Sequence, residues 1–153
     1  MVTELKQKQK SLYDTDYHLW ILDTIEKLEK KDLDSLDWEN LIEEVSSLGR
    51  RDQKKIESLL TRLLEHLLKL QYWDSEKERN ENHWKGEIIN FRIQIRRELK
   101  SSPSLKRYLI EICEECYDDA KKIVSNKSSL PLNTFPKKLI LSFEQILDEN
   151  WLP

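Results

Sequence analysis

The chain has 153 residues, of which 38% are hydrophobic and 36% are charged. Its 26 basic and 29 acidic residues give a formal net charge of −3, so the chain lacks the basic excess typical of nucleic-acid-binding proteins. No apolar run approaches the roughly 18 residues of a membrane span, and the N-terminus lacks the apolar core of a signal peptide. We therefore expect a cytoplasmic protein that does not associate with a membrane.

Only two glycines and four prolines occur in the whole chain. Sheets joined by tight turns normally need more of both, so the composition favours helices. The length fits one domain of ordinary size. We predict an all-α fold, a compact bundle of five to six helices forming a single domain over residues 1–153, with residues 1–11 as a loose polar N-terminal tail.

Three helices are predicted in the first half of the chain. Apolar residues at helical spacing predict the first over residues 14–30 and the second over 36–48. Gly49 follows at a position where glycine often ends a helix. The third helix is predicted over residues 52–72, and its apolar face is broad enough for the centre of a bundle.

Three further helices are predicted in the second half, with two polar linkers between them. The linkers are expected at residues 74–82 and 126–136, the second of which carries two prolines. The helices are expected over residues 82–99, 102–125 and 137–148. Nothing in the composition indicates a domain boundary.

Cys113 and Cys116 have the two-residue gap that is typical of redox and zinc motifs. Both fall on the apolar face of a predicted helix, and no second pair of Cys or His stands at ligand spacing. A redox pair should begin a helix after a strand, and no strand is predicted here. We therefore expect two buried reduced thiols, no metal and no cofactor.

Arg92 lies within an apolar arc of its predicted helix, beside Leu99, so we expect it to be at least half buried. A buried guanidinium needs a carboxylate or several carbonyls as partners. We predict Glu44 as the partner, and otherwise Glu43. This gives two interpretations. The pair is structural, or Arg92, Glu44 and His66 line one pocket that binds an anion or a metal-bound ligand.

Basic residues gather at the end of the fourth predicted helix and just after it. They are Arg96, Arg97, Lys100, Lys106 and Arg107. A patch of this kind could contact nucleic acid, but basic residues late in a helix also complement its dipole, and acidic residues are interleaved nearly everywhere else. We expect no tight nucleic-acid binding.

Several short motifs resemble the small helical family catalogued as domain of unknown function 29. They are Leu12-Tyr13-Asp14-Thr15-Asp16-Tyr17, Leu41-Ile42-Glu43-Glu44-Val45 with Leu48-Gly49-Arg50, His66-Leu67-Leu68-Lys69 followed by Trp73, Trp84 with Ile88 and Arg92, and Pro103-Ser104-Leu105. The resemblance implies a stand-alone helical domain, mainly cyanobacterial and cytoplasmic, and the family carries no established activity to transfer.

No catalytic constellation is complete, so we expect a protein-interaction or regulatory module rather than an enzyme. The alternatives are the ligand-binding or enzymatic pocket and the nucleic-acid patch. Candidate site residues, within or beside the resembling motifs, are Glu43, Glu44, His66, Lys69, Trp84 and Arg92. A protein partner and a homo-oligomer are both left open.

Overall fold

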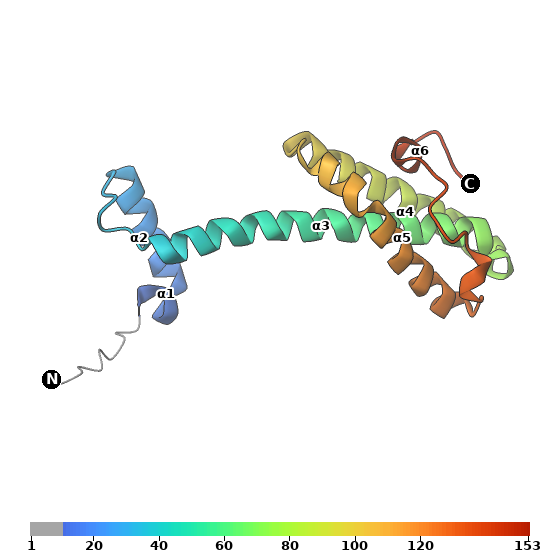
Figure 1. Ribbon diagram of the computed structural model, residues 1–153, viewed down its shortest axis with the longest axis horizontal. Helices are drawn as coiled ribbons and strands as arrows, with labels where there is room; N and C mark the ends of the chain where they lie inside the picture. Colours follow the sequence, from blue (N-terminus) through green and yellow to red (C-terminus); the bar gives the residue numbers. More distant parts are fainter. Residues whose placement is uncertain (1–10) are drawn as a thin grey trace. The chain divides into compact units, whose positions relative to one another are not determined.

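Every regular element is a helix in residues 11–153, the part of the chain that the computed structural model describes (Figure 1). The elements are α1 (Leu12–Thr15), α2 (Tyr17–Glu29), α3 (Trp38–Tyr72), α4 (Asp74–Ser101), α5 (Leu105–Ser128), a 3₁₀ turn η1 (Leu132–Thr134) and α6 (Phe143–Leu147). The all-α prediction is confirmed, and the predicted tail at residues 1–11 lies almost wholly outside the described residues.

Helix α3 is one helix of 35 residues, where the sequence predicted two helices separated at Gly49. That prediction was wrong because Gly49 does not adopt the positive φ that would end a helix. A glycine inside a helix costs only about 1 kcal/mol relative to alanine, and good helix formers flank it on both sides. An ion pair of 2.7 Å between Glu43 and Arg50 also spans the position.

Only Trp73 separates α3 from α4, so the linker predicted at residues 74–82 is wrong. This stretch has no apolar period, yet Glu76, Lys77 and Arg79 are good helix formers. Asp74 and Glu76 also lie in the first turn of α4, where negative charge complements the helix dipole.

The last helix is shorter than predicted, because residues 137–141 do not continue it. The Ser142 side chain accepts a hydrogen bond from the Gln145 amide (3.1 Å) and so fixes the start of α6. The preceding backbone is bound elsewhere, since Lys121 of α5 donates to the Lys137 carbonyl at 2.9 Å.

Two compact units divide the chain, the first ending at Arg50 and the second running from Arg51 to Pro153. We call them unit 1 and unit 2. Among the described residues of unit 1, only Trp20, Thr24 and Leu36 are buried. The indole of Trp20 donates to Asp37 (3.2 Å), which links α2 to the residue just before α3.

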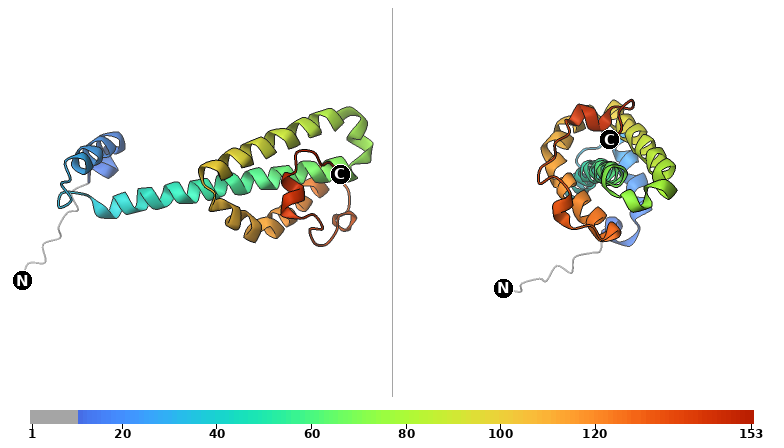
Figure 2. Two further views of the ribbon diagram at one scale, coloured as in Figure 1. Left: turned by 90° about the horizontal axis from the view of Figure 1, so that it is seen from above. Right: turned by 90° about the vertical axis from the view of Figure 1, so that its right-hand side faces the viewer.

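Unit 2 holds the core. The second half of α3 packs with α4, α5 and the C-terminal segment, as both views of Figure 2 show. Fully buried residues come from all four, and include Ile56, Leu60, Leu63, Ile88, Ile95, Leu109, Ala120, Val124 and Ile146. Polar contacts fix the neighbouring helices, since Lys55 of α3 contacts Glu98 of α4 at 2.6 Å and Tyr108 of α5 donates to Glu57 of α3 at 2.7 Å.

None of the helices between residues 11 and 153 combines the length and the apolar character needed to cross a membrane.

Candidate functional site

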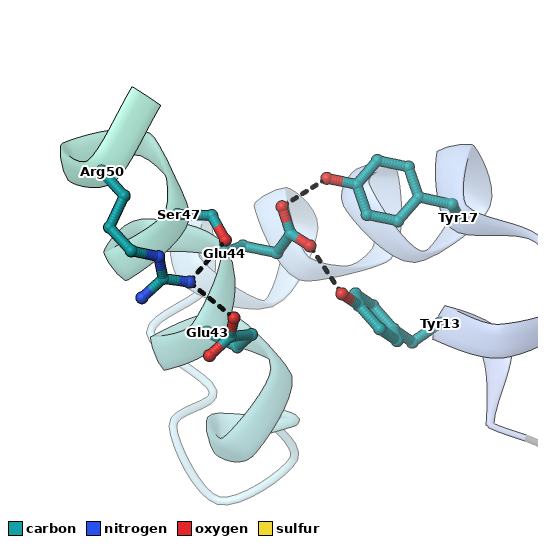
Figure 3. Close-up of polar contacts among 6 residues, drawn as sticks. All are labelled: Tyr13, Tyr17, Glu43, Glu44, Ser47 and Arg50. Atoms are coloured by element: carbon teal, nitrogen blue, oxygen red, sulfur yellow. Dashed lines mark hydrogen bonds and ion pairs between the residues drawn. The ribbon is translucent and has the colours of Figure 1, made fainter. Parts of the chain in front are cut away.

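Two tyrosines and one glutamate join the first three helices within unit 1 (Figure 3). Tyr13 of α1 and Tyr17 of α2 each donate to a different carboxylate oxygen of Glu44 on α3, both at 2.6 Å. The hydrogen bond to Glu44 is the main reason why the pKa of Tyr13 is raised to about 12. Glu44 is therefore a shared acceptor that holds α1 and α2 on one face of α3.

The two hydrogen bonds to Glu44 place α1 and α2 beside this face of α3. Leu41 and Ser47 lie within about 60° of Glu44 on the helical wheel, and both are half-buried. Ile42 and Val45 lie roughly 160° and 100° away from Glu44. They are 62% and 60% exposed, so α3 presents apolar side chains to solvent on its far side and on the adjoining flank.

The exposed side belongs to a stripe that runs the length of α3. Ile42, Gly49, Ile56 and Leu63 are each seven residues apart, so they share one face of the helix. Ile56 and Leu63 are completely buried in the core of unit 2, whereas Ile42 is mostly exposed. The same apolar stripe is therefore covered in its second half and uncovered in its first.

Trp38 extends the uncovered part by one further turn and is 49% exposed. Its ring nitrogen donates to the Leu33 carbonyl at 3.0 Å, which leaves the rest of the indole as apolar surface. We call Trp38, Ile42 and Val45 the exposed seam.

Helix α2 adds more apolar surface to unit 1. Among the described residues, eleven of the sixteen exposed large hydrophobic side chains lie in residues 12–48, although unit 2 is much the larger unit. Those of α2 are Tyr17, Leu19, Leu22, Ile25 and Leu28. An accumulation of this kind marks an interaction surface more often than chance exposure.

Arg92 is 1% exposed, as expected, but its partners are not carboxylates. Its Nε donates to the Ile146 carbonyl and its Nη1 to the Trp151 carbonyl, both at 2.8 Å. The predicted ion pair with Glu44 or Glu43 is therefore wrong. The buried guanidinium takes backbone carbonyls from the C-terminal segment, which no sequence period could indicate, and its Nη2 has no hydrogen-bond partner.

The other candidate residues of unit 2 have local partners. The His66 ring packs on Phe91, with centroids 5.3 Å apart, and its Nδ1–H donates to the Arg62 carbonyl at 2.7 Å. Lys69 pairs with Glu65 at 3.0 Å, and Trp84 stacks on Trp73 with ring centroids 5.6 Å apart.

Unit 2 also has a surface hollow of about 310 Å³, between α3 and α5. Its lining includes Arg62, Glu65 and Ile123, but neither His66 nor Arg92. His66, Lys69, Trp84 and Arg92 thus each have a partner within unit 2, whereas Glu43 and Glu44 lie in unit 1.

Both cysteines are buried and free of any disulfide. Burial raises the pKa of the Cys113 thiol to about 11. The thiolate is the reactive form, so this thiol is poorly suited to redox or nucleophilic work.

Two of the five clustered basic residues have acidic partners. Arg96 contacts Glu149 at 2.5 Å and Arg107 contacts Glu111 at 3.1 Å, and all four side chains are well exposed. These pairs weaken the positive field that a nucleic-acid surface would need.

The fold and the exposed seam define an all-helical protein with an uncovered apolar face on α3. The model of the family described as Domain of unknown function DUF29 matches residues 12–152, so the chain belongs to this family. Comparisons with curated proteins and with solved structures gave no match.

Proposed function

We propose that this protein is a non-enzymatic protein-interaction module that docks through the apolar surface of unit 1. The observation that carries the proposal is the stripe on α3, in which Ile56 is fully buried while Ile42, on the same face, is 62% exposed. A covered stripe that continues into an uncovered one is what a helix shows when another helix completes its packing.

The polar network supports this proposal, because it fixes the docking face. Tyr13 and Tyr17 bind Glu44 from one side of α3, and this leaves Ile42 on the opposite side and Val45 on the adjoining flank. A surface held by hydrogen bonds loses less conformational entropy on binding than a mobile one. The cytoplasmic location stays a prediction of the sequence.

Affinity capture from a lysate of the source organism tests the proposal. The tagged full chain is compared with Ile42→Asp, which places a charge in the exposed seam. The matched control is Ile89→Asp, which changes an isoleucine of α4 that is 51% exposed. Proteins captured by the wild type should be retained by the control and lost with Ile42→Asp. Equal capture by both variants would contradict the proposal.

A further inference from the structure

Unit 1 has too little core for its size. Of its described residues only three are buried, one of them the polar Thr24. Unit 1 runs from Met1 to Arg50, and a core this small is commonly supplemented by a disulfide, a metal or a second subunit. Both cysteines lie in unit 2, and no cluster of metal-binding side chains occurs among the described residues. Of the disulfide, the metal and the second subunit, the described residues are therefore compatible only with the second subunit.

Gly49 is an observation independent of the exposed seam. It lies inside α3 with an ordinary helical φ, and a Cβ built on it would meet no atom within 4 Å. Neither the backbone nor the packing of the chain therefore requires a glycine there, although the glycine weakens the helix. A bulky side chain arriving from another molecule would need the space.

We infer that the occupant of the exposed seam is a second copy of this chain, with the two α3 helices packed antiparallel about a twofold axis. The inference rests on the proposed function, since it names the partner for the same surface. When Ile42 of one copy faces Val45 of the other, Trp38 comes opposite Gly49 of the second copy, because the two numberings run in opposite directions. Trp38, the largest residue of this face, then lies opposite Gly49, the smallest, at each end of the interface.

A parallel pair would fit poorly. It would place Trp38 beside Trp38 and Gly49 beside Gly49, which crowds one layer and leaves a gap in another. Cores favour large residues opposite small ones, so the side-chain sizes select the antiparallel arrangement. Glu43 and Glu44 lie on other sides of the helix, so this pairing buries neither carboxylate.

The exposed seam sets the size of the proposed interface. At on the order of 100 Å² for each half-exposed side chain, the three residues of the exposed seam offer roughly 300 Å² per copy, the size of a small, transient interface.

Analytical ultracentrifugation of the purified full chain is the first test. We expect a dimer of twice 18.5 kDa with a dissociation constant on the order of 10 μM or tighter. Val45→Asp should weaken dimerisation at least about 30-fold, because it places a charge at the centre of the interface. A wild type that stays monomeric at about ten times that concentration would overturn the inference.

Gly49→Leu, with Gly86→Leu as its control, tests the register. Both glycines lie inside helices with open space around them. Only Gly49→Leu should weaken the dimer, by about tenfold or more, while circular dichroism shows both variants to be helical. Adding Trp38→Ala to Gly49→Leu should restore part of the affinity. Equal effects of the two leucine variants would contradict the proposed register.

Cysteine crosslinking tests the orientation. A mixture of Trp38→Cys and Gly49→Cys chains should give a mixed disulfide dimer, whereas either variant alone should crosslink poorly. Strong crosslinking of Trp38→Cys alone would indicate a parallel pair and overturn the inference. If the protein is monomeric but still captures another protein through Ile42, the second-copy inference fails and the proposed function stands.

Discussion

Arg92 is held by backbone carbonyls, and this has a measurable consequence for stability. Arg92→Met removes the donors to the Ile146 and Trp151 carbonyls. Hydrogen bonds from a charged group contribute about 1.5–3 kcal/mol, so we expect a loss of about that size in the free energy of unfolding. Urea unfolding followed by tryptophan fluorescence measures it.

The control for Arg92 lies one turn further along α4. Arg96 also contacts the C-terminal segment, through Glu149, but both side chains are about half exposed. Arg96→Met should therefore cost only about 0–1 kcal/mol. Equal losses for the two variants would mean that the two carbonyl contacts add no net stability.

His66 gives the protein a component of stability that depends on pH. Burial lowers the pKa of His66 below its ordinary value of 6.5. The unfolded chain therefore takes up a proton at a higher pH than the folded chain does. Stability should fall as the pH falls from about 6.5 towards the lower pKa of the folded state.

Urea unfolding at several pH values checks the contribution of His66. The His66→Gln variant should lose part of the decline in stability below about pH 6.5, whereas His83→Gln, at an exposed position, should keep it. The same pH profile in His66→Gln and the wild type would rule out this histidine as the source.

At the scale of the elements, Glu65 connects α3 to α5. It pairs with Lys69 on its own helix (3.0 Å) and with Lys127 on α5 (2.7 Å). Burial alone would raise the pKa of the Glu65 carboxyl, but the hydrogen bonds from the two lysines outweigh burial and lower it. Glu65 and Lys69 are both buried, whereas Lys127 is half exposed.

Removing the charge of Glu65 should therefore be costly. Glu65→Gln leaves the buried Lys69 without its ionic partner, so we expect a loss of about 3–5 kcal/mol in the free energy of unfolding. Lys127→Met should cost only about 0–1 kcal/mol, because that lysine is well solvated. A double change of Glu65→Leu and Lys69→Met should recover most of the loss, and failure to recover would show that the pair is not the cause.

The sequence predicted the helices whose apolar period is strong and missed those defined by other means. The broad apolar face of residues 52–72 is the core face of α3. The start of α4 was missed because its first turns are stabilised by charge and propensity, with few apolar positions. The break expected at Gly49 was wrong, because one glycine costs less than the flanking turns contribute.

The candidate site could be predicted only in part, for a related reason. The burial of Arg92 followed from its place on the helical wheel. Its partners lie 54 and 59 residues away on irregular backbone, where sequence carries no period. The exposed seam could have been predicted, because Ile42, Gly49 and Ile56 keep the seven-residue spacing across the position where a helix end was expected.

At the scale of the whole molecule, the two units should differ in how readily they open. Unit 1 buries three of its described residues, whereas the core of unit 2 is extensive. We expect amides of α2 to exchange with deuterium at a lower opening free energy than amides near Leu63. Mass spectrometry of exchange in fragments covering α2 and the second half of α3 measures the difference.

Protein concentration supplies the control for this comparison. Protection of α2 should rise with concentration if a second copy covers unit 1, while protection near Leu63 should not change. Equal protection of α2 and of the residues near Leu63 in the monomer would contradict the expected difference between the units.

The single domain inferred from chain length stays a prediction, and α3 runs unbroken through the boundary between the units.

The single residue between α3 and α4 bears on the order in which the protein folds. Trp73 joins the two helices directly and stacks on Trp84, only eleven positions away. Contacts so close in sequence form quickly, because little chain entropy is lost in closing the loop. The hydrogen bonds of Arg92 can form only when carbonyls more than fifty positions later in the chain have packed against it. The α3–α4 hairpin should therefore form early, and the C-terminal segment should lock onto Arg92 as one of the last steps.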